Sequence, residues 1–404
     1  MPGTQAQKGI SHRRLTSAGS WRSKAKQQRK KAIKYEVLPN LEPGLVKLKR
    51  NKHLDLNYHA EFLLKDFGLA LSPAVGPAPR LVAFEFTSPA KASSKPNSLI
   101  FVGGLTDGFC TVPYVSKLAE ALEDTDWSLF SVLLTTSYNG FGTGHLDRDV
   151  EELGKCVQFI RDLKADRYPG APSASGKIAI MGHSTGSQDV LRYLHAPNPL
   201  PQTDNDIGLQ YIVRPELDGA IMQAPVSDRE AILAAVKSAQ HQSEAQRAYD
   251  KLVDSAKTQL GAADGSDSIL PMNTLAKVGL PGDAPITARR FLSLASPDSP
   301  ANPSEEDLFS SDLGDKRLEE TFGAIGSRGI LQSMLCVLYS GNDEYCPTWV
   351  NKEALMGRWK QATEAGGAKW DAETSGVVPG ASHNVQDEGQ DDLLDRVVRY
   401  LKSL

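Results

Sequence analysis

Residues 177–193, with the sequence KIAIMGHSTGSQDVLRY, restrict the possible folds of this chain more than any other segment. A short apolar run leads directly into GHSTG at residues 182–186, and apolar residues at helical spacing follow. This order predicts a strand, a tight turn with Ser184 at its apex, and a helix. Gly182 and Gly186 are expected where strand and helix approach too closely for a side chain. A serine hydroxyl is a weak nucleophile, so the turn gains a chemical role only if a histidine can take its proton.

Predicted strands and helices alternate along much of the remaining chain. Continuous apolar runs predict buried strands at residues 98–102, 128–135, 217–222 and 334–339, with a shorter strand near 374–378. Apolar residues at helical spacing lie between several of these runs. Two β-prone segments, 35–49 and 81–87, predict an antiparallel pair at one edge of the sheet. The alternation predicts an α/β fold, with a mostly parallel sheet and helices on both of its faces.

Residues 228–330 have a different pattern. Helical pieces rich in Ala, Ser and Asp are broken there by Gly- and Pro-containing segments. We interpret this segment as a helical lid inserted into a single domain that spans residues 35–404. Few aromatic residues occur in it, which favours a polar cover over the broad apolar face expected of an interfacial lipase.

The first 34 residues form a basic arm. Residues 1–50 contain thirteen Lys or Arg against two Glu, although the whole chain has a net charge of −4. The arm is poor in apolar residues, so it cannot offset the entropy of ordering and is predicted to be disordered. It lacks the apolar segment of a secretory signal peptide, and mitochondrial or nuclear targeting remains the alternative to a solvated tail.

Composition excludes several classes of protein. Hydrophobic residues make up 40% of the chain and charged residues 23%, and the net negative charge disfavours a uniform nucleic-acid-binding surface. No apolar run approaches the roughly 20 residues that span a bilayer. Four cysteines without a C-x-x-C pair indicate neither a disulfide framework nor a zinc site. We therefore expect a cytoplasmic protein without stable membrane insertion, with no nucleic-acid partner and no metal.

Two further loops supply the partners that a hydrolytic serine needs. Asp343 lies in SGNDEYCP, directly after the predicted strand 334–339, and His383 lies in GASHN, after the last short strand. Both loops are expected at the carboxyl edge of the sheet, where open α/β sheets bind ligands. The order Ser184, Asp343, His383 is the one expected for an α/β-hydrolase fold. We predict His383 as the base and Asp343 as the acid that orients it.

Other residues compete for these roles. Glu344 is adjacent to Asp343, and Asp228 follows the preceding strand, where some lipases keep their acid. Three other histidines are poorer candidates for the base: His145, His183 and His195. Four carboxylates near the start of one predicted helix are interpreted as a charged helix N-terminus rather than as catalytic groups: Asp147, Asp149, Glu151 and Glu152.

The oxyanion formed by attack on an ester requires two backbone N–H donors. Thr185, immediately after the predicted nucleophile, would supply one. The glycine-rich loop GGLTDG, after the strand 98–102, would supply the other. Leu105 is the predicted donor in that loop, with Gly104 as the alternative.

Six segments together resemble a known family: FVGGLTDGF, SYNGFGTGHL, GHSTGSQD, APVSDREA, SGNDEYCP and GASHN. The combination is similar to the fungal siderophore esterase (fusarinine C esterase) family of α/β-hydrolases. The resemblance extends from about residue 35 to the C-terminus, and SYNGFGTG and APVSDREA are its narrower signals. The basic arm lies outside it.

The resemblance implies a triad of Ser184, Asp343 and His383. It also implies hydrolysis of ester bonds in a hydroxamate siderophore, which would release iron inside the cell without a resident metal or organic cofactor. The expected partner is thus a small-molecule ester, a ferric siderophore. A general carboxylesterase or lipase is the alternative activity. A catalytically silent binding protein of hydrolase fold is the alternative from another class.

Overall fold

The computed structural model describes residues 81–86, 94–168, 176–202, 208–262 and 267–404, together with the backbone of two short strands at 45–47 and 61–63. The predicted arm, residues 1–34, lies outside these residues. Its disorder and its role in targeting therefore stay predictions.

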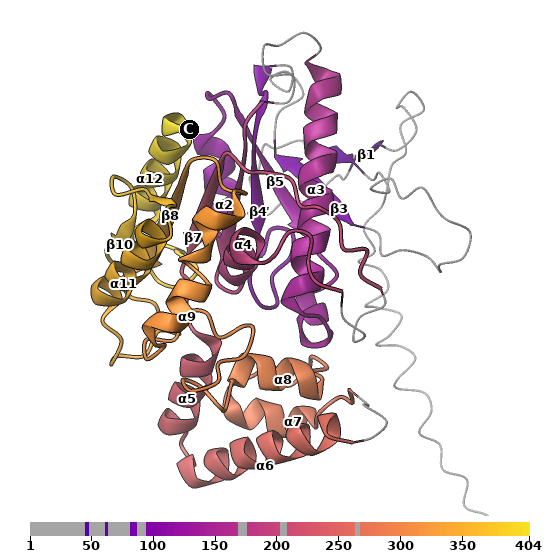
Figure 1. The fold of residues 1–404 in the computed structure, drawn as a ribbon, viewed down its shortest axis with the longest axis vertical. Coiled ribbons are helices and arrows are strands. Elements are labelled where there is room, and N and C mark those ends of the chain that lie inside the picture. The colour runs from indigo at the N-terminus through magenta and orange to yellow at the C-terminus, as the bar shows by residue number, and fades with distance from the viewer. Residues whose placement is uncertain are drawn as a thin grey trace, which may run out of the picture.

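A mixed sheet forms the centre of the described fold, with the strand order β1-β2-β3-β5-β4-β6-β7-β8-β10 (Figure 1). The strands are β1 (Leu45–Lys47), β2 (Glu61–Leu63), β3 (Val82–Phe86), β4 (Asn97–Val102), β5 (Trp127–Leu133), β6 (Ile178–His183), β7 (Gly219–Gln223), β8 (Met334–Ser340), β9 (Lys369–Trp370) and β10 (Gly376–Val378). From β5 to β10 every pair is parallel, and the pairs β1–β2, β2–β3 and β3–β5 are antiparallel. The mostly parallel sheet is confirmed.

Helices cover both faces of this sheet. They are α2 (Tyr114–Ala121), α3 (Leu146–Arg167), α4 (Gly186–His195), α11 (Lys352–Ala365) and α12 (Gln390–Ser403), with the 3₁₀ segment η3 (Tyr138–Thr143) after β5. Apolar side chains of α3, α4 and α11 belong to one core, and those of α2 and α12 belong to the other.

The sequence of β4 explains why two cores form. Ile100 and Val102 belong to the core beneath α3 and α4, whereas Leu99 and Phe101 belong to the core beneath α2 and α12. Successive side chains of a strand point to opposite faces, so a continuous apolar run requires cover on both sides. The apolar run at residues 98–102 therefore places this strand in the middle of the sheet.

Short strands account for the differences from the predicted topology. The segment 81–87 does contain β3, but β3 pairs with β2 and β5 rather than with β1. The predicted direct pairing of residues 35–49 with 81–87 is therefore wrong, because β2 lies between them. We did not predict β2 or the two-residue β9, since strands this short carry too little periodicity to detect.

The described residues between β7 and β8 form seven helical elements. They are α5 (Asp228–Ser238), α6 (Gln242–Leu260), α7 (Met272–Leu275), η4 (Ala276–Val278), α8 (Ala288–Ala295), α9 (Asp315–Glu320) and α10 (Ala324–Arg328). Helices α5 to α8 form a separate lobe below the sheet in Figure 1 and have an apolar core of their own. Side chains of α9 and α10 instead join the main core beneath α3 and α4. We refer to α5–α8 as the helical lobe.

The helical lobe contacts the loop that follows β5. Phe141 of η3 belongs to the core of the lobe, and the N–H of Thr287 donates to the carbonyl of Gly142 at 2.9 Å. Gly142 has no space for a side chain, because an added Cβ would lie 2.0 Å from the Pro285 carbonyl oxygen. Leu105 also packs against the lobe core. The lobe is therefore attached to two loops at the carboxyl edge of the sheet.

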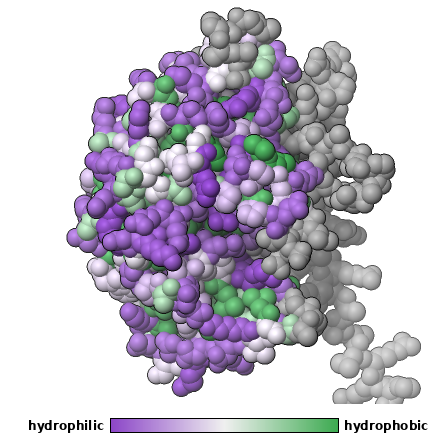
Figure 2. Space-filling model, in the orientation of Figure 1, coloured by the Kyte–Doolittle hydropathy of each residue, from purple (hydrophilic) through white to green (hydrophobic). Residues whose placement is uncertain are grey.

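The face of the molecule in Figure 2 is mainly hydrophilic, with small hydrophobic groups in both its upper and its lower part. Among the described helices, none combines the length and the apolar character that crossing a membrane requires.

Replacing Gly182 with Ala should destabilise the fold. An added Cβ would lie 2.1 Å from the carbonyl oxygen of Gly186, and neither backbone segment can withdraw without moving the β6–α4 turn. We expect a loss of about 2 kcal/mol in the free energy of unfolding, measured by denaturant titration. Gly357→Ala is the control, because nothing lies within 4 Å of its added Cβ on α11. Helix propensity should make that variant up to about 1 kcal/mol more stable. Equal stability of the two variants would contradict the close approach.

Candidate active site

Ser184 follows β6 in a turn with an unusual backbone. Its φ is +55°, a value that costs free energy for a residue with a side chain, and its N–H donates to the Gln223 carbonyl at 2.9 Å. Gly186 lies so close to β4 that an added Cβ would be 2.5 Å from the Val102 carbonyl oxygen. The turn thus holds Ser184 at its apex, at the carboxyl edge of the sheet, as the GHSTG segment predicted. The strain of its backbone is an additional feature that the structure shows.

The structure brings the three predicted residues into one hydrogen-bonded chain. His383 Nε2 lies 2.8 Å from Ser184 Oγ, and His383 Nδ1 lies 2.8 Å from Asp343 Oδ2. His383 and Asp343 are each only 5% exposed, so water competes little for these bonds. A neutral imidazole that donates from Nδ1 to the carboxylate presents Nε2 as the acceptor of a serine proton.

Neighbouring residues hold the two loops that carry this pair. The carboxylate of Glu344 accepts the backbone N–H of His383 at 2.8 Å, and the Tyr345 N–H donates to Asp343 Oδ1 at 3.0 Å. The ring of Tyr345 meets the His383 ring edge-on at 4.8 Å between centroids. Glu344, one of the competing acids, therefore bonds to the backbone of the histidine, while Asp343 bonds to its ring.

The other competing acid, Asp228, bonds elsewhere. It begins α5 and accepts a hydrogen bond from Gln188 Nε2 at 2.5 Å. Burial raises the pKa of Asp228 to about 6, and the Gln188 hydrogen bond only partly opposes this rise. Within the described residues, the hydrogen bonds of the His383 ring go to Asp343 and Ser184.

The remaining candidate histidines occupy structural positions. His145 caps α3 by accepting from the Arg148 N–H, and His195 bonds through Nδ1 to the Leu191 carbonyl at 2.7 Å. His183 is buried between Gln223 and Asn384, with its ring 5.0 Å from the His383 ring. Burial, followed by the nearby charge of His383, lowers the pKa of His183. A neutral His183 does not repel the imidazolium that His383 forms when it takes a proton.

The two predicted oxyanion donors lie beside Ser184. An added Cβ on Gly104 would be 2.6 Å from Ser184 Cβ, so the GGLTDG loop touches the nucleophile. The Gly104 N–H is already engaged, since it donates to Asp107 Oδ2 at 2.8 Å. The N–H groups of Leu105 and Thr185 have no acceptor among the described residues. This difference favours Leu105 over Gly104 as the second donor.

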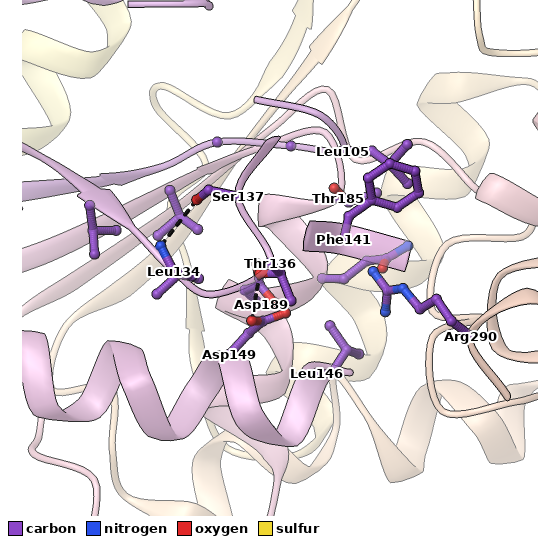
Figure 3. Close-up of a pocket in the computed structure, with 15 residues that line it drawn as sticks. Leu105, Leu134, Thr136, Ser137, Phe141, Leu146, Asp149, Thr185, Asp189 and Arg290 are labelled. Carbon is purple, nitrogen blue, oxygen red and sulfur yellow. Dashed lines mark hydrogen bonds between the residues drawn. The ribbon is translucent and has the colours of Figure 1, made fainter. Parts of the chain in front are cut away.

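A small pocket of about 20 Å³ opens beside these amides (Figure 3). Leu105 and Thr185 lie on one side of it, and Asp149 and Asp189 lie on another. Arg290 reaches it from α8 of the helical lobe. Polar side chains from α3, α4 and the lobe therefore meet next to the nucleophile.

The carboxylates of this pocket are buried rather than solvated. Asp149 is 2% exposed and accepts a hydrogen bond from Thr136 Oγ1 at 2.6 Å. Burial raises the pKa of Asp149 to about 7. Burial, with the negative charge of Asp149 as the next cause, also raises the pKa of Asp189 well above its ordinary value. We interpreted Asp149 as part of a charged helix N-terminus, and its burial at the pocket is a feature that this interpretation missed.

The structure also shows where a second carboxylate of that helix lies. Glu152 is buried and accepts from the Thr135 N–H and hydroxyl at 2.8 and 2.9 Å. Helical spacing did not reveal this burial, because Asp149 and Glu152 adjoin Val150 and Leu153 in sequence and neighbours in sequence do not share a helix face. Within the described residues, no group of three or more His, Cys, Asp or Glu side chains is arranged to hold a metal ion.

Comparison with known proteins shows a clear family relationship. A family model described as "Protein of unknown function (DUF1749)" matches residues 76–403. The chain is 47% identical over 335 residues to fusarinine C esterase sidJ of Aspergillus fumigatus, covering 80% of this chain and 93% of that protein. It is 44% identical over 337 residues to esterase AN6793 of Emericella nidulans, covering 80% and 88%.

A solved structure is similar as well. The siderophore hydrolase EstB from Aspergillus fumigatus superimposes with a TM-score of 0.70 at 45% identity, covering 82% of this chain and 98% of that one. The predicted α/β-hydrolase fold and the predicted family resemblance are both confirmed.

Replacing Asp149 with Asn should change how stability depends on pH. The pKa of Asp149 is raised from 3.8 in the unfolded chain to about 7 in the fold. The contribution of Asp149 to the free energy of unfolding is therefore fully present below pH 4 and is lost as pH rises to about 7. The variant should gain stability relative to the parent over that range, by up to about 4 kcal/mol. Unfolding titrations between pH 4 and 8 measure the difference. Asp162→Asn, on the exposed face of α3, is the control and should show no such gain.

Proposed function

Because the chain belongs to the DUF1749 family and to the siderophore esterases that it matches over four fifths of its length, we propose that it is a serine esterase that hydrolyses ester bonds of a hydroxamate siderophore. The main support for a serine esterase mechanism is the chain of two 2.8 Å hydrogen bonds from Ser184 through His383 to Asp343. The names of its relatives support the choice of substrate.

In the proposed mechanism, His383 Nε2 removes the proton from Ser184 Oγ while the oxygen attacks the ester carbonyl carbon. Asp343 keeps the proton on Nδ1 and stabilises the imidazolium. The imidazolium then protonates the oxygen of the departing alcohol as its bond to the carbonyl carbon breaks. The acyl group stays bound to Ser184 Oγ. A water molecule, deprotonated by His383, attacks that acyl group and releases the acid.

The negative charge on the carbonyl oxygen needs donors that are in position before the reaction. We assign the N–H groups of Thr185 and Leu105 to this role. Both lack acceptors among the described residues, and the Gly104 contact keeps the Leu105 loop against Ser184. Donors that need no rearrangement stabilise the transition state more than the ground state.

The composition of residues 228–330 favours a dissolved, polar ester over a lipid surface. Few aromatic residues occur in this segment, whereas the lid of an interfacial lipase is expected to hide a broad apolar face. The iron of a ferric siderophore arrives with the substrate. Since ester hydrolysis would release that iron for use inside the cell, we propose a cytoplasmic location.

The test is hydrolysis of iron-loaded and iron-free fusarinine-type siderophores by the full chain, followed by separation of the products. Short p-nitrophenyl esters and emulsified triacylglycerol are compared in parallel. We expect saturation kinetics on the siderophore and no jump in rate when a lipid ester passes its solubility limit. Faster hydrolysis of emulsified triacylglycerol, with such a jump, would make the chain a lipase.

Replacing Ser184 with Ala should remove the acyl-enzyme route. The loss in kcat should be on the order of 10³ or more, because the members of a triad act as a unit. A fluorophosphonate probe should label the parent protein and leave this variant unlabelled. Retention of activity within tenfold would refute the nucleophile assignment, and a protein that is neither labelled nor active would be a silent binding protein.

Replacing Asp343 with Asn should be far more damaging to kcat than Asp228→Asn, by about 10² or more, because an amide at position 343 favours the wrong tautomer of His383. Glu344→Gln should have a small effect, since its amide oxygen still accepts the His383 N–H. Steady-state kinetics of the three variants on one soluble ester make the comparison. The largest loss in Asp228→Asn would assign the acid to α5.

A further inference from the structure

Several bonds within the loop after β4 go to one residue, Asp107. Its Oδ2 atom accepts the Gly104 N–H at 2.8 Å, and its Oδ1 atom accepts the Thr111 hydroxyl at 2.8 Å. Its backbone carbonyl accepts the Tyr138 N–H at 2.8 Å, which connects this loop to the segment after β5. The Asp107 side chain is 17% exposed, so water competes only in part for these bonds. Asp107 takes no part in the proton transfers of the proposed hydrolysis.

A further bond from Asp107 fixes the peptide group that contains the second oxyanion donor. The Asp107 N–H donates to the Gly104 carbonyl at 3.0 Å and closes a tight turn. That carbonyl and the Leu105 N–H belong to one peptide group, which is planar and trans, so they point in opposite directions. Because the carbonyl oxygen is held towards Asp107, the Leu105 N–H points to the other side. There it has no acceptor among the described residues.

The same peptide group lies next to the nucleophile. An added Cβ on Gly104 would be 2.6 Å from Ser184 Cβ and 3.2 Å from Ser184 Oγ. Leu105 and Thr185, the two assigned donors, line one small pocket. Rotation of the Gly104–Leu105 peptide group would therefore withdraw an N–H donor and turn a carbonyl oxygen towards the developing oxyanion. The orientation of this one peptide group decides whether the second donor is present.

The loop needs bonds to keep this orientation. Gly103 and Gly104 precede Leu105, and glycine has the least restricted backbone of all residues. Thr106 has a φ of +69°, which costs free energy for a β-branched residue. An added Cβ on Gly103 would lie 2.7 Å from Asp107 Cβ, so Asp107 packs directly against the start of the loop. Its bonds offset both the freedom of the glycines and the strain at Thr106.

We propose that Asp107 is a positioning residue, whose carboxylate and backbone N–H hold the peptide groups on either side of Gly104 so that the Leu105 N–H faces the oxyanion. This inference rests on the proposed esterase function and adds the residue that keeps its second donor in place. Asp107 does not touch the substrate or the reacting atoms. The role requires a hydrogen-bond acceptor at position 107 and does not require a negative charge.

The charge of Asp107 offers a competing explanation that can be separated. Asp107 Oδ2 lies 3.9 Å from His183 Nε2, and the His183 ring lies 5.0 Å from the His383 ring. A role through charge would act on the catalytic histidine along this route. Asparagine at position 107 distinguishes the two roles, because its amide oxygen still accepts the Gly104 N–H while the charge is lost. Its amide N–H can donate to the Thr111 hydroxyl oxygen.

The test compares Asp107→Ala, Asp107→Asn and Asp218→Ala in the full chain. Asp218 is the matched control, because its carboxylate accepts the Ile178 N–H at 2.8 Å at the other end of β6. It thus makes the same kind of bond away from the nucleophile. Steady-state kinetics are measured on p-nitrophenyl butyrate.

In Asp107→Ala, kcat should fall about tenfold to a hundredfold with KM within about threefold of the parent, because loss of a complete oxyanion donor costs about 10² to 10³ in kcat. Asp107→Asn should recover most of this loss. Asp218→Ala should keep the kcat of the parent. An equal fall in Asp107→Ala and Asp218→Ala would overturn the proposal, and so would an Asp107→Asn variant as slow as Asp107→Ala.

Two ketones with the acyl chain of this ester separate orientation of the donor from general damage to the site. Ser184 Oγ adds to the carbonyl carbon of propyl trifluoromethyl ketone, and the carbonyl oxygen of the resulting hemiketal occupies the oxyanion position. Methyl propyl ketone binds as the intact ketone. In Asp107→Ala the inhibition constant of the first should rise about tenfold to a hundredfold and that of the second less than about threefold, since only the first resembles the transition state. Equal rises would contradict the proposal.

The outcomes also separate this inference from the proposed function. If the parent hydrolyses p-nitrophenyl butyrate but no siderophore, the proposed substrate is wrong, and the variants still decide the role of Asp107. If the parent hydrolyses no ester and fluorine NMR detects no hemiketal, both proposals fail. If Asp107→Ala does not fold, Thr111→Val replaces it, because it removes the hydroxyl that holds Asp107 Oδ1. Its kcat should fall about threefold to tenfold, as expected for loss of one hydrogen bond, and an unchanged kcat would overturn the proposal.

Discussion

The site depends on backbone segments that touch where side chains are absent. Gly186 lies against the carbonyls of Val102 and Gly103, and Gly104 lies against Ser184. These contacts connect β4, β6 and α4 into one rigid corner. Because the nucleophile and the loop of the second oxyanion donor belong to the same corner, neither can shift without the other. The strained φ of Ser184 is tolerated because this corner leaves the residue no alternative conformation.

Much of this arrangement could be predicted from the sequence, because its signals are local. Apolar runs located the central strands, and the residues directly after them, such as Asp343 and His383, had to meet at the carboxyl edge of a parallel sheet. The two 2.8 Å bonds of His383 are the geometry that this reasoning implies. The choice of Leu105 over Gly104 required the structure, since it depends on the bond from Gly104 to Asp107.

Features that depend on distant contacts could not be predicted. Asp149 and Glu152 look like a solvated helix start in the sequence, yet Thr136 and Thr135 from the loop after β5 bond to them inside the protein. Burial at such positions is decided by which loop covers the helix, and that information lies outside the helix itself. The short strands β2 and β9 were missed for a related reason, since their pairing is specified by neighbours and not by their own few residues.

The helical lobe has an apolar core of its own, and it meets the rest of the protein at loops on the carboxyl edge of the sheet and through the hydrogen bond from Gln188 of α4 to Asp228 of α5. Mutations inside that core therefore change the lobe without disturbing the packing of the sheet and its covering helices. Arg290 shows that the lobe still contributes to the surroundings of the nucleophile. Substitutions in the helical lobe can consequently change which substrate is bound, while the residues at the carboxyl edge of the sheet that cleave the bond stay the same.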